Sequence, residues 1–207
     1  MIAFLVLLNI AFFIYIRYRS QAKVHDKLEN THEQLKEIAR TDPLTELSNR
    51  RDIIEKIEYE QIRFERNKNP FVIIIGDLDF FKSINDRYGH DCGDYVLKKV
   101  AQILRTTIRK QDIVSRWGGE EFLLLLPETP LEGGKVAAEK VRKKIENSNL
   151  KYNNDPLSIT ITLGVSVYDN VMEIDDCIKK ADQALYRGKH KGRNCVVAVR
   201  PEDIIIG

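Results

Sequence analysis

Two pairs of acidic residues stand at the ends of apolar segments, where their carboxylates are suited to bind a cation. Asp77 and Asp79 end the run "FVIIIGDLD", and strand residues two apart point to the same face. Glu120 and Glu121 follow two glycines, a two-residue hairpin signal, and precede five apolar residues. Carboxylates gathered at neighbouring strand ends are costly unless a cation neutralises them. The all-oxygen ligand set favours Mg²⁺ completed by phosphate oxygens. The alternative is a set of solvated turn acids.

Basic residues in two other segments are suited to a phosphate-bearing ligand. Lys82 follows the aspartate strand, and Lys189, Lys191 and Arg193 lie in "RGKHKGRN", a predicted loop whose glycines leave room for phosphate. On its own, such a loop is more often a solvated run of charge. The chain has 33 Lys and Arg against 31 Asp and Glu, which argues against a broad nucleic-acid surface but not against a small anionic ligand.

The apolar pattern predicts an α/β domain that positions these side chains. Apolar content of 43% and charged content of 31% are ordinary for a globular domain. The order of elements predicts an α/β (α+β) fold of the ferredoxin-like or palm type, a mixed sheet with helices packed on one face. We expect helices at 45–66, 94–109, 133–147 and 174–187, and strands at 71–79, 113–117, 121–126, 157–168 and 194–199.

The first eighteen residues predict a membrane anchor. Residues 2–16, "IAFLVLLNIAFFIYI", carry no charge, and Arg17 and Arg19 follow at once, as expected of an anchor with the cytoplasm on its C-terminal side. We expect 1–18 to be a single-pass anchor in the inner (cytoplasmic) membrane, with the rest of the chain in the cytoplasm. A signal peptide, the last span of a larger sensor and a soluble core helix are the alternatives.

Residues 19–41 predict a helical stalk. Their apolar positions are spaced 4, 3, 4, 3, which is a heptad seam with one polar interruption. An amphipathic helix packed on its own domain is the alternative. Pro43 stops the pattern, so the globular domain is expected at 42–207. The seam residues are Val24, Leu28, Thr31, Leu35 and Ile38.

Four segments together resemble the GGDEF domain, the catalytic module of diguanylate cyclases. "GGEEF" at 118–122 is the glutamate variant of the signature, and the other three are "DPLTELSNRR" at 42–51, "DLDFFKSINDRYGHDCGDYVL" at 77–97 and "ADQALYRGKHKGRN" at 181–194. Gly76 departs from the pattern, because a larger apolar residue is common there. The resemblance implies that two GTP molecules are joined into cyclic di-GMP, with release of two pyrophosphates, by a homodimer whose GTP sites face each other.

The resemblance also implies roles for single residues. Asp77 and Glu120 through their carboxylates, and Leu78 through its carbonyl, would bind Mg²⁺, two ions per site, with Mn²⁺ as a substitute. Glu120 is the implied proton acceptor, and Glu121 is implied to assist at the metal or the ribose. The implied substrate-binding residues are Asn85 and Asp94 for guanine, His90 beside them, Lys82, Lys189 and Arg193 for the triphosphate, and the backbone N–H groups of Phe80 and Phe81, whose rings are expected in the core.

Arg109 and Asp112, in "RKQD", match the family's inhibitory product site. Arginine stacks on guanine and reads its acceptors, whereas aspartate reads its donors. Cyclic di-GMP is therefore expected to be both product and inhibitor, and the alternative is a surface ion pair at a helix end. Two other functions stay open: a catalytically silent receptor for GTP or cyclic di-GMP, and a dimerisation module.

Overall fold

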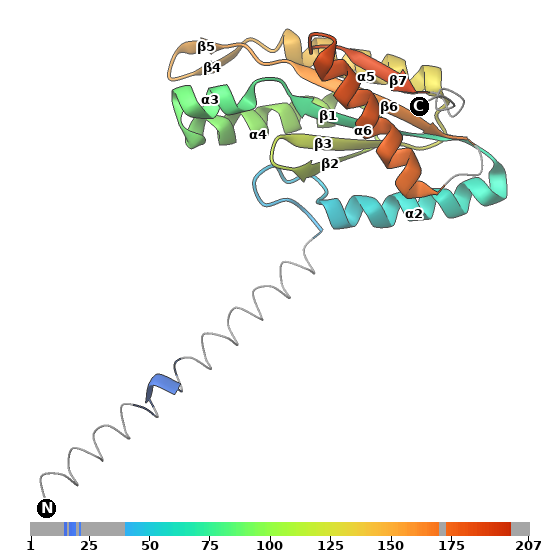
Figure 1. Ribbon diagram of the computed structural model, residues 1–207, viewed down its shortest axis with the longest axis horizontal. Coiled ribbons are helices and arrows are strands. Elements are labelled where there is room, and N and C mark those ends of the chain that lie inside the picture. Colours follow the sequence, from blue (N-terminus) through green and yellow to red (C-terminus); the bar gives the residue numbers. More distant parts are fainter. Residues whose placement is uncertain (1–14, 16, 20, 22–39, 170–172, 200–207) are drawn as a thin grey trace, which may run out of the picture. The chain divides into compact units, whose positions relative to one another are not determined.

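The computed structural model describes Tyr15, residues 17–19, Gln21, residues 40–169 and residues 173–199 (Figure 1). The chain divides into two compact units, Met1–Arg40 and Thr41–Gly207. Tyr15, residues 17–19 and Gln21 are helical. Most of the predicted anchor and the whole heptad seam lie outside the described residues. Among the helices that are described, none combines the length and the apolar character needed to cross a bilayer.

The second unit is built on a five-stranded mixed sheet with the order β2-β3-β1-β6-β7. Strands β1, β3 and β6 pair antiparallel with β1 in the middle, β2 pairs antiparallel with β3, and β7 runs parallel to β6. A separate hairpin pairs β4 with β5. The strands are β1 (Phe71–Leu78), β2 (Ile113–Gly118), β3 (Glu121–Leu126), β4 (Leu150–Tyr152), β5 (Asp155–Leu157), β6 (Ile161–Tyr168) and β7 (Val196–Val199).

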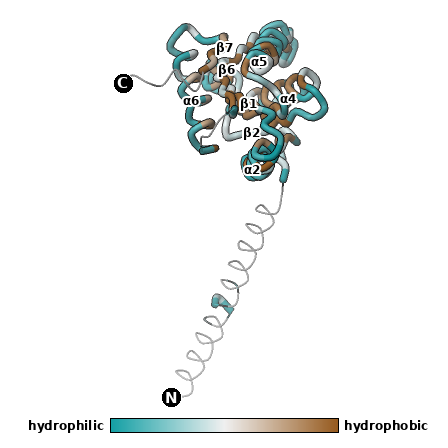
Figure 2. Tube along the Cα trace, turned by 90° about the vertical axis from the view of Figure 1, so that its right-hand side faces the viewer, coloured by the Kyte–Doolittle hydropathy of each residue, from teal (hydrophilic) through white to brown (hydrophobic). Residues whose placement is uncertain are grey.

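Helices cover both faces of the sheet, so the prediction of helices on one face only is wrong. Val72 and Ile74 of β1 lie in one buried cluster, while Ile73 and Ile75 lie in the other. Every residue of β1 is buried. A strand that is covered on both faces carries apolar residues at nearly every position, which explains the continuous apolar run in the sequence. Figure 2 shows apolar colour on the central strands. One cluster includes α3 (Phe81–Tyr88), α4 (His90–Thr107) and α5 (Leu131–Glu146); the other includes α2 (Arg50–Asn67) and α6 (Ile174–His190).

Several element boundaries differ from the prediction. Helix α2 begins at Arg50 rather than residue 45, because the Asn49 side chain caps it by accepting a hydrogen bond from the Asp52 N–H at 2.9 Å. Helix α3 and the β4–β5 hairpin were not predicted, and the strand expected at 157–168 begins only at Ile161, because Leu157 is the last residue of β5. Helix α6 extends to His190, so Lys189 lies on a helix and not in a loop.

Gly164 in β6 allows α6 to lie directly on the sheet. A Cβ atom there would stand 2.0 Å from the Ala181 carbonyl oxygen and 2.3 Å from the Leu185 nitrogen, both backbone atoms of α6. Because backbone cannot rotate away, Gly164→Ala should lower the free energy of unfolding by about 3 kcal/mol, measured by urea denaturation. In the control Gly133→Ala, the new atom meets a Thr129 methyl group at 3.0 Å, and the change should stay within about 1 kcal/mol. Equal losses in both variants would contradict the close contact.

Candidate active site

Strand pairing brings the acidic residues of two segments together. Asp77, near the end of β1, is paired with Glu121, the first residue of β3. Asp77 is buried, whereas Glu120 and Glu121 are half-buried. The Leu78 N–H donates to the Glu120 carbonyl oxygen at 3.4 Å, which ties the turn to the end of β1. The carboxylates of Asp77, Glu120 and Glu121 therefore lie together at one end of the neighbouring strands β1 and β3. They are called the acid group below.

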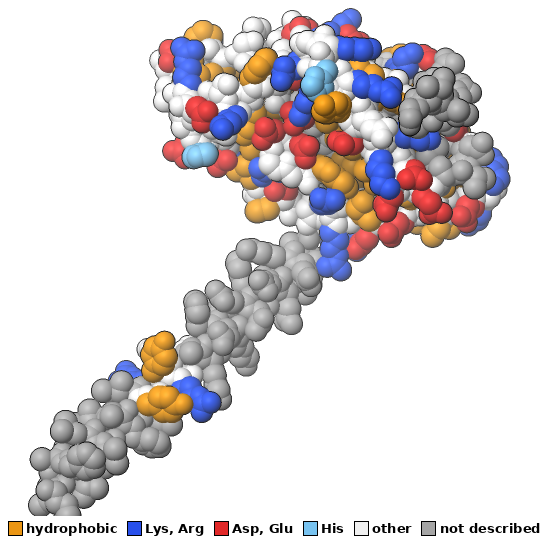
Figure 3. Space-filling model, viewed as in Figure 1, with side chains coloured by type: hydrophobic (Ala, Val, Ile, Leu, Met, Phe, Trp, Pro, Cys, Tyr) orange, Lys and Arg blue, Asp and Glu red, His pale blue; other side chains and the backbone are white. Residues whose placement is uncertain are grey.

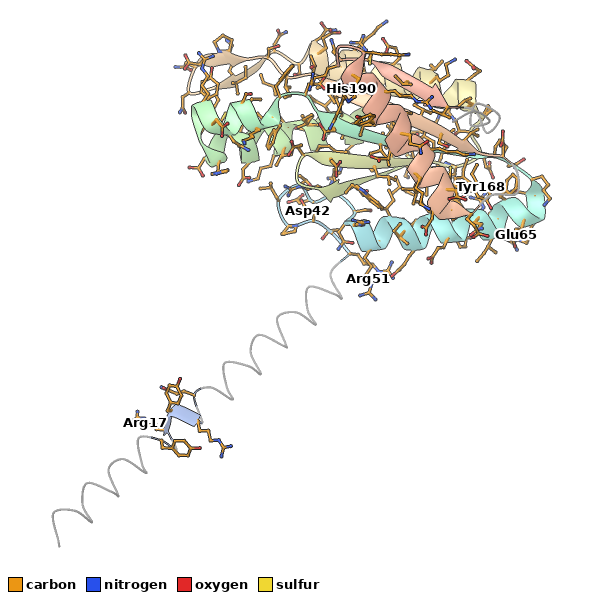
Figure 4. The ribbon with its side chains drawn as sticks, in the orientation of Figure 1. Arg17, Asp42, Arg51, Glu65, Tyr168 and His190 are labelled. Atoms are coloured by element: carbon orange, nitrogen blue, oxygen red, sulfur yellow. The ribbon has the colours of Figure 1, made fainter. Side chains whose placement is uncertain are left out.

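The segment before α2 stabilises the turn that carries Glu120 through contacts made by Arg116. The turn residues are Gly119 and Glu120, one position later than predicted, and Gly119 has φ +50°. Arg116 donates from Nε to the Gly119 carbonyl oxygen at 2.9 Å, and its Nη1 lies 3.2 Å from Asp42 Oδ2. Burial acts to raise the pKa of Asp42, but hydrogen bonds from Thr45 and Arg116 outweigh it and lower that pKa. Figure 4 shows Asp42 in this segment.

Lys189 is the hydrogen-bonded counter-charge of the acid group. Its Nζ lies 2.8 Å from Asp77 Oδ2. Burial raises the pKa of Asp77, and Lys189 opposes this rise. Burial and the charge of Asp77 also raise the pKa of Glu121, again against Lys189. Lys189 therefore does not fully offset the burial and mutual repulsion of these carboxylates, and this condition favours the binding of a cation.

The donor atoms of the acid group fit Mg²⁺ better than a softer metal. Carboxylate and carbonyl oxygens suit magnesium, which binds few protein ligands and keeps water or phosphate oxygens, whereas zinc prefers histidine and cysteine. Within the part of the chain that the structure describes, no group of three or more His, Cys, Asp or Glu side chains is arranged to hold a metal ion by itself.

Asp79 does not join the acid group, although it stands two residues from Asp77. Its Oδ1 accepts a hydrogen bond from the Thr162 hydroxyl at 2.6 Å. Its Oδ2 accepts from the Thr160 hydroxyl at 2.7 Å and from the Asn194 N–H at 3.0 Å. Asp79 is therefore a structural anchor that joins the end of β1 to β6 and to the segment after α6.

Asn194 fixes the backbone that carries Arg193. Its Oδ1 accepts from Arg142 Nη1 at 2.8 Å, and its Nδ2 donates to Glu146 Oε1 at 2.6 Å. Arg193 itself has φ 64°, a left-handed conformation that a non-glycine residue adopts only when its surroundings hold it. We did not predict this role for Asn194 or Arg142. The only sequence signal is the position of Asn194 at the end of the "RGKHKGRN" motif.

The two phenylalanines of the "DLDFFK" segment differ in environment. The Phe81 ring is 6% exposed and lies in the core, as predicted, but Phe80 is 64% exposed, so the prediction of a core ring is wrong there. The Arg193 guanidinium lies over the Phe80 ring, 4.7 Å from its centroid. Helix α3 begins at Phe81, with Lys82 exposed in its first turn. The first N–H groups of a helix have no intrahelical partner, so this end of α3 is suited to phosphate.

The packing of α3 on α4 brings Asn85 against Gly93. A Cβ atom added to Gly93, the residue before Asp94, would stand 2.0 Å from Asn85 Oδ1. That oxygen is buried, and among the described residues it has no hydrogen-bond partner. Asp94 and His90 are exposed in the first turns of α4. A glycine inside a helix is unfavourable by itself, so Gly93 is a signal for this close approach that we did not use.

Arg109 and Asp112 lie at the other end of β2 from the turn. The Arg109 backbone N–H donates to Asp112 Oδ2 at 2.9 Å, so the Arg109 side chain is not needed for this bond. Arg109 is exposed. Asp112 Oδ1 is buried without a hydrogen-bond partner in the described part of the chain, and burial raises the pKa of this carboxyl group. The exposed Arg109 therefore lies beside a carboxyl group with one buried oxygen that has no hydrogen-bond partner among the described residues.

A family model described as "Diguanylate cyclase, GGDEF domain" matches residues 39–195. The chain belongs to this family. Gly76, the departure from the pattern, is compatible with the GGDEF fold, because the Leu163 and Ile161 side chains fill the space beside it. The predicted α/β fold with a mixed sheet and flanking helices is likewise confirmed by solved GGDEF structures.

Curated relatives share the GGDEF region over most of this chain. The diguanylate cyclase DgcP of Pseudomonas aeruginosa is 40% identical over 170 residues, which are 82% of this chain and 25% of that protein. The diguanylate cyclase DgcM of Escherichia coli is 40% identical over 177 residues, 84% of this chain and 42% of that protein. The chain thus spans less than half the length of these relatives.

Two solved structures extend the comparison. Diguanylate cyclase SiaD of Pseudomonas aeruginosa, solved with its activator SiaC, has a TM-score of 0.75 and 34% identity, with 94% of this chain and 76% of that chain covered. The coiled coil and GGDEF domain of DgcB from Caulobacter crescentus, solved with cyclic di-GMP, has a TM-score of 0.75 and 26% identity, with 90% and 99% covered.

Proposed function

We propose that this chain is a diguanylate cyclase that condenses two GTP molecules into cyclic di-GMP and releases two pyrophosphates. The observation that carries the proposal is the pairing of Asp77 with Glu121, which gathers the acid group beside Lys189. A metal–triphosphate complex needs carboxylates for the metal and basic groups for the phosphates. The carboxylates and the basic Lys189 meet at this end of β1 and β3, in a chain of the GGDEF family.

The residues divide the work of the reaction between them. Asp77 and Glu120, with the Leu78 carbonyl, would hold Mg²⁺ or Mn²⁺, two ions per site, which polarise the α-phosphate and lower the pKa of the attacking ribose 3′-hydroxyl. Glu120 is the proposed proton acceptor for that hydroxyl, and Glu121, which is paired with Asp77, would assist at the metal or the ribose. Lys82, Lys189, Arg193 and the N–H groups at Phe80 and Phe81 would hold the triphosphate.

Guanine would be read between α3 and α4. Guanine presents two adjacent donors, N1–H and the 2-amino group, and adenine lacks this pair. Asp94 is suited to accept from both donors, and the Asn85 amide, which packs against Gly93, is the second proposed contact with the base. His90 lies exposed in the first turn of α4, within four residues of Asp94.

The reaction requires two copies of the chain, because each holds one GTP. We propose a homodimer joined by the stalk at 19–41 and by the catalytic domains. We also propose that residues 1–18 anchor the chain in the inner membrane, with the catalytic domain in the cytoplasm. Figure 3 shows acidic and basic side chains interspersed on one face of the molecule, and nucleic acid is not among the proposed partners.

Cyclic di-GMP is proposed to inhibit the enzyme at Arg109 and Asp112. Arg109→Ala removes the guanine-stacking group but keeps the hydrogen bond to Asp112, because the Arg109 backbone makes it. We expect initial rates within about twofold of wild type and inhibition by added cyclic di-GMP weakened by at least about tenfold. Progress curves with added product measure both. The exposed neighbour Lys110 supplies the control, Lys110→Ala, which should be inhibited like wild type. Equal inhibition of wild type and Arg109→Ala would place the site elsewhere.

Incubation of the purified protein with GTP and Mg²⁺, followed by mass spectrometry of the nucleotides, tests the proposed activity. A silent receptor would bind GTP or cyclic di-GMP without forming product. A dimerisation module would bind neither nucleotide. Formation of cyclic di-GMP excludes both alternatives.

A further inference from the structure

We infer that Lys189 is an exchangeable counter-ion. Its ammonium forms an ion pair with the Asp77 carboxylate when no metal is bound, and it moves to the phosphates when metal and nucleotide bind together. This inference rests on the proposed function. It adds that Lys189 couples the binding of the divalent cation to the binding of the triphosphate. Lys189 is thus a competitor of the metal at Asp77 as well as a phosphate ligand.

The ion pair lies on the atoms that a metal would use. Lys189 Nζ is 2.8 Å from Asp77 Oδ2, with the side chains 33% and 12% exposed. Asp77 faces Glu121 across the β1–β3 pairing. In this arrangement the Lys189 ammonium is the cation that neutralises the Asp77 carboxylate.

A divalent cation bound at Asp77 and the Lys189 ammonium on Asp77 Oδ2 would repel each other strongly at this partly buried site. Metal binding therefore competes with the Lys189–Asp77 contact, and an ammonium that is displaced loses a charge-assisted hydrogen bond. When the metal arrives without nucleotide, the displaced ammonium gains no phosphate oxygen in exchange. The ion pair therefore weakens the binding of metal alone.

A triphosphate changes this balance, because its oxygens offer the displaced ammonium a new partner. Helix α6 is fixed against β6 at Gly164, so the exchange needs only side-chain rotation of Lys189. Lysine is suited to it, since its ammonium is a compact point charge on a flexible stem. Metal and nucleotide then strengthen each other's binding, and thermodynamic linkage requires the effect to be reciprocal.

Titration with Mn²⁺, followed by electron paramagnetic resonance, tests the inference without any turnover. In the absence of nucleotide, Lys189→Met should bind Mn²⁺ about tenfold more tightly than wild type, because the competing ammonium is gone. With a non-hydrolysable GTP analogue present, Mn²⁺ affinity should rise strongly in wild type and at least about fivefold less in Lys189→Met. Lys189→Gln should behave like Lys189→Met, which guards against an effect of one particular side chain.

Lys191→Met is the matched control. Lys191 lies two residues further on and is exposed, and the structure places it near Cys195 rather than at the acid group. Its Mn²⁺ affinity without nucleotide should stay within about twofold of wild type. The inference is overturned if Lys189→Met binds Mn²⁺ no more tightly than wild type, or if Lys191→Met gains as much. These titrations use no GTP turnover, so failure of the proposed cyclase activity would be seen separately.

Discussion

Asp77→Asn should lower the rate of cyclic di-GMP formation by at least about 100-fold and leave the domain folded. The amide keeps the size of the side chain but removes the charge needed at the metal. The fold should survive, because burial already disfavours the Asp77 carboxylate and a neutral amide relieves that cost. Rates measured with GTP and Mg²⁺, together with thermal melting followed by circular dichroism, separate the two effects.

Asp155→Asn is the control for loss of one negative charge. Asp155 is exposed in the β4–β5 hairpin, away from the paired residues Asp77 and Glu121. The rate of cyclic di-GMP formation by this variant should stay within about twofold of wild type. A folded Asp77→Asn protein with full activity would show that Asp77 is not a metal ligand in the reaction.

Asp94→Ala should remove most of the preference for GTP over ATP. We expect kcat/KM for GTP to fall by about 100-fold or more, because a site built to accept the two guanine donors loses its acceptor. The low rate with ATP should change little, since adenine never offers that donor pair. The ratio of the two kcat/KM values, measured from pyrophosphate release, is therefore the informative quantity.

Asp91→Ala controls for the loss of an acidic residue in the first turn of α4. Asp91 is exposed, like Asp94, and one turn of helix separates the two positions. GTP preference should be kept in this variant. Loss of preference in both variants, or in neither, would show that Asp94 does not read the base.

Most of the sheet and the acid group could be predicted from the sequence. Strands β1 and β3 are runs of large apolar residues that end or begin in acids, and antiparallel pairing then places Asp77 opposite Glu121. The hairpin signal "GG" located the turn to within one residue. The resemblance to the GGDEF domain added which segments contribute to the site, because its four motifs occur in order along the chain. Local pattern was sufficient to place these acids at strand ends, because Asp77 follows a continuous apolar run and Glu121 follows the glycine turn.

The remaining features depend on contacts between distant segments, which periodicity does not encode. Asp79 has the spacing of a metal ligand, but Thr160, Thr162 and Asn194 occupy its oxygens. Phe80 is apolar and yet exposed, because the left-handed turn before α3 directs it toward Arg193. The helices cover both faces because β1 and β3 are apolar on both. That run of apolar residues was visible in the sequence, but we read it as the core of a one-sided sheet.

The most direct test of the account is the formation of cyclic di-GMP from GTP and Mg²⁺ by the full chain. The nucleotides are resolved by chromatography and identified by mass spectrometry, with ATP in place of GTP and EDTA in place of Mg²⁺ as controls. We expect cyclic di-GMP and two pyrophosphates for each product molecule, with no product in either control. A folded protein that binds GTP but forms no cyclic di-GMP at any Mg²⁺ or Mn²⁺ concentration would contradict the account.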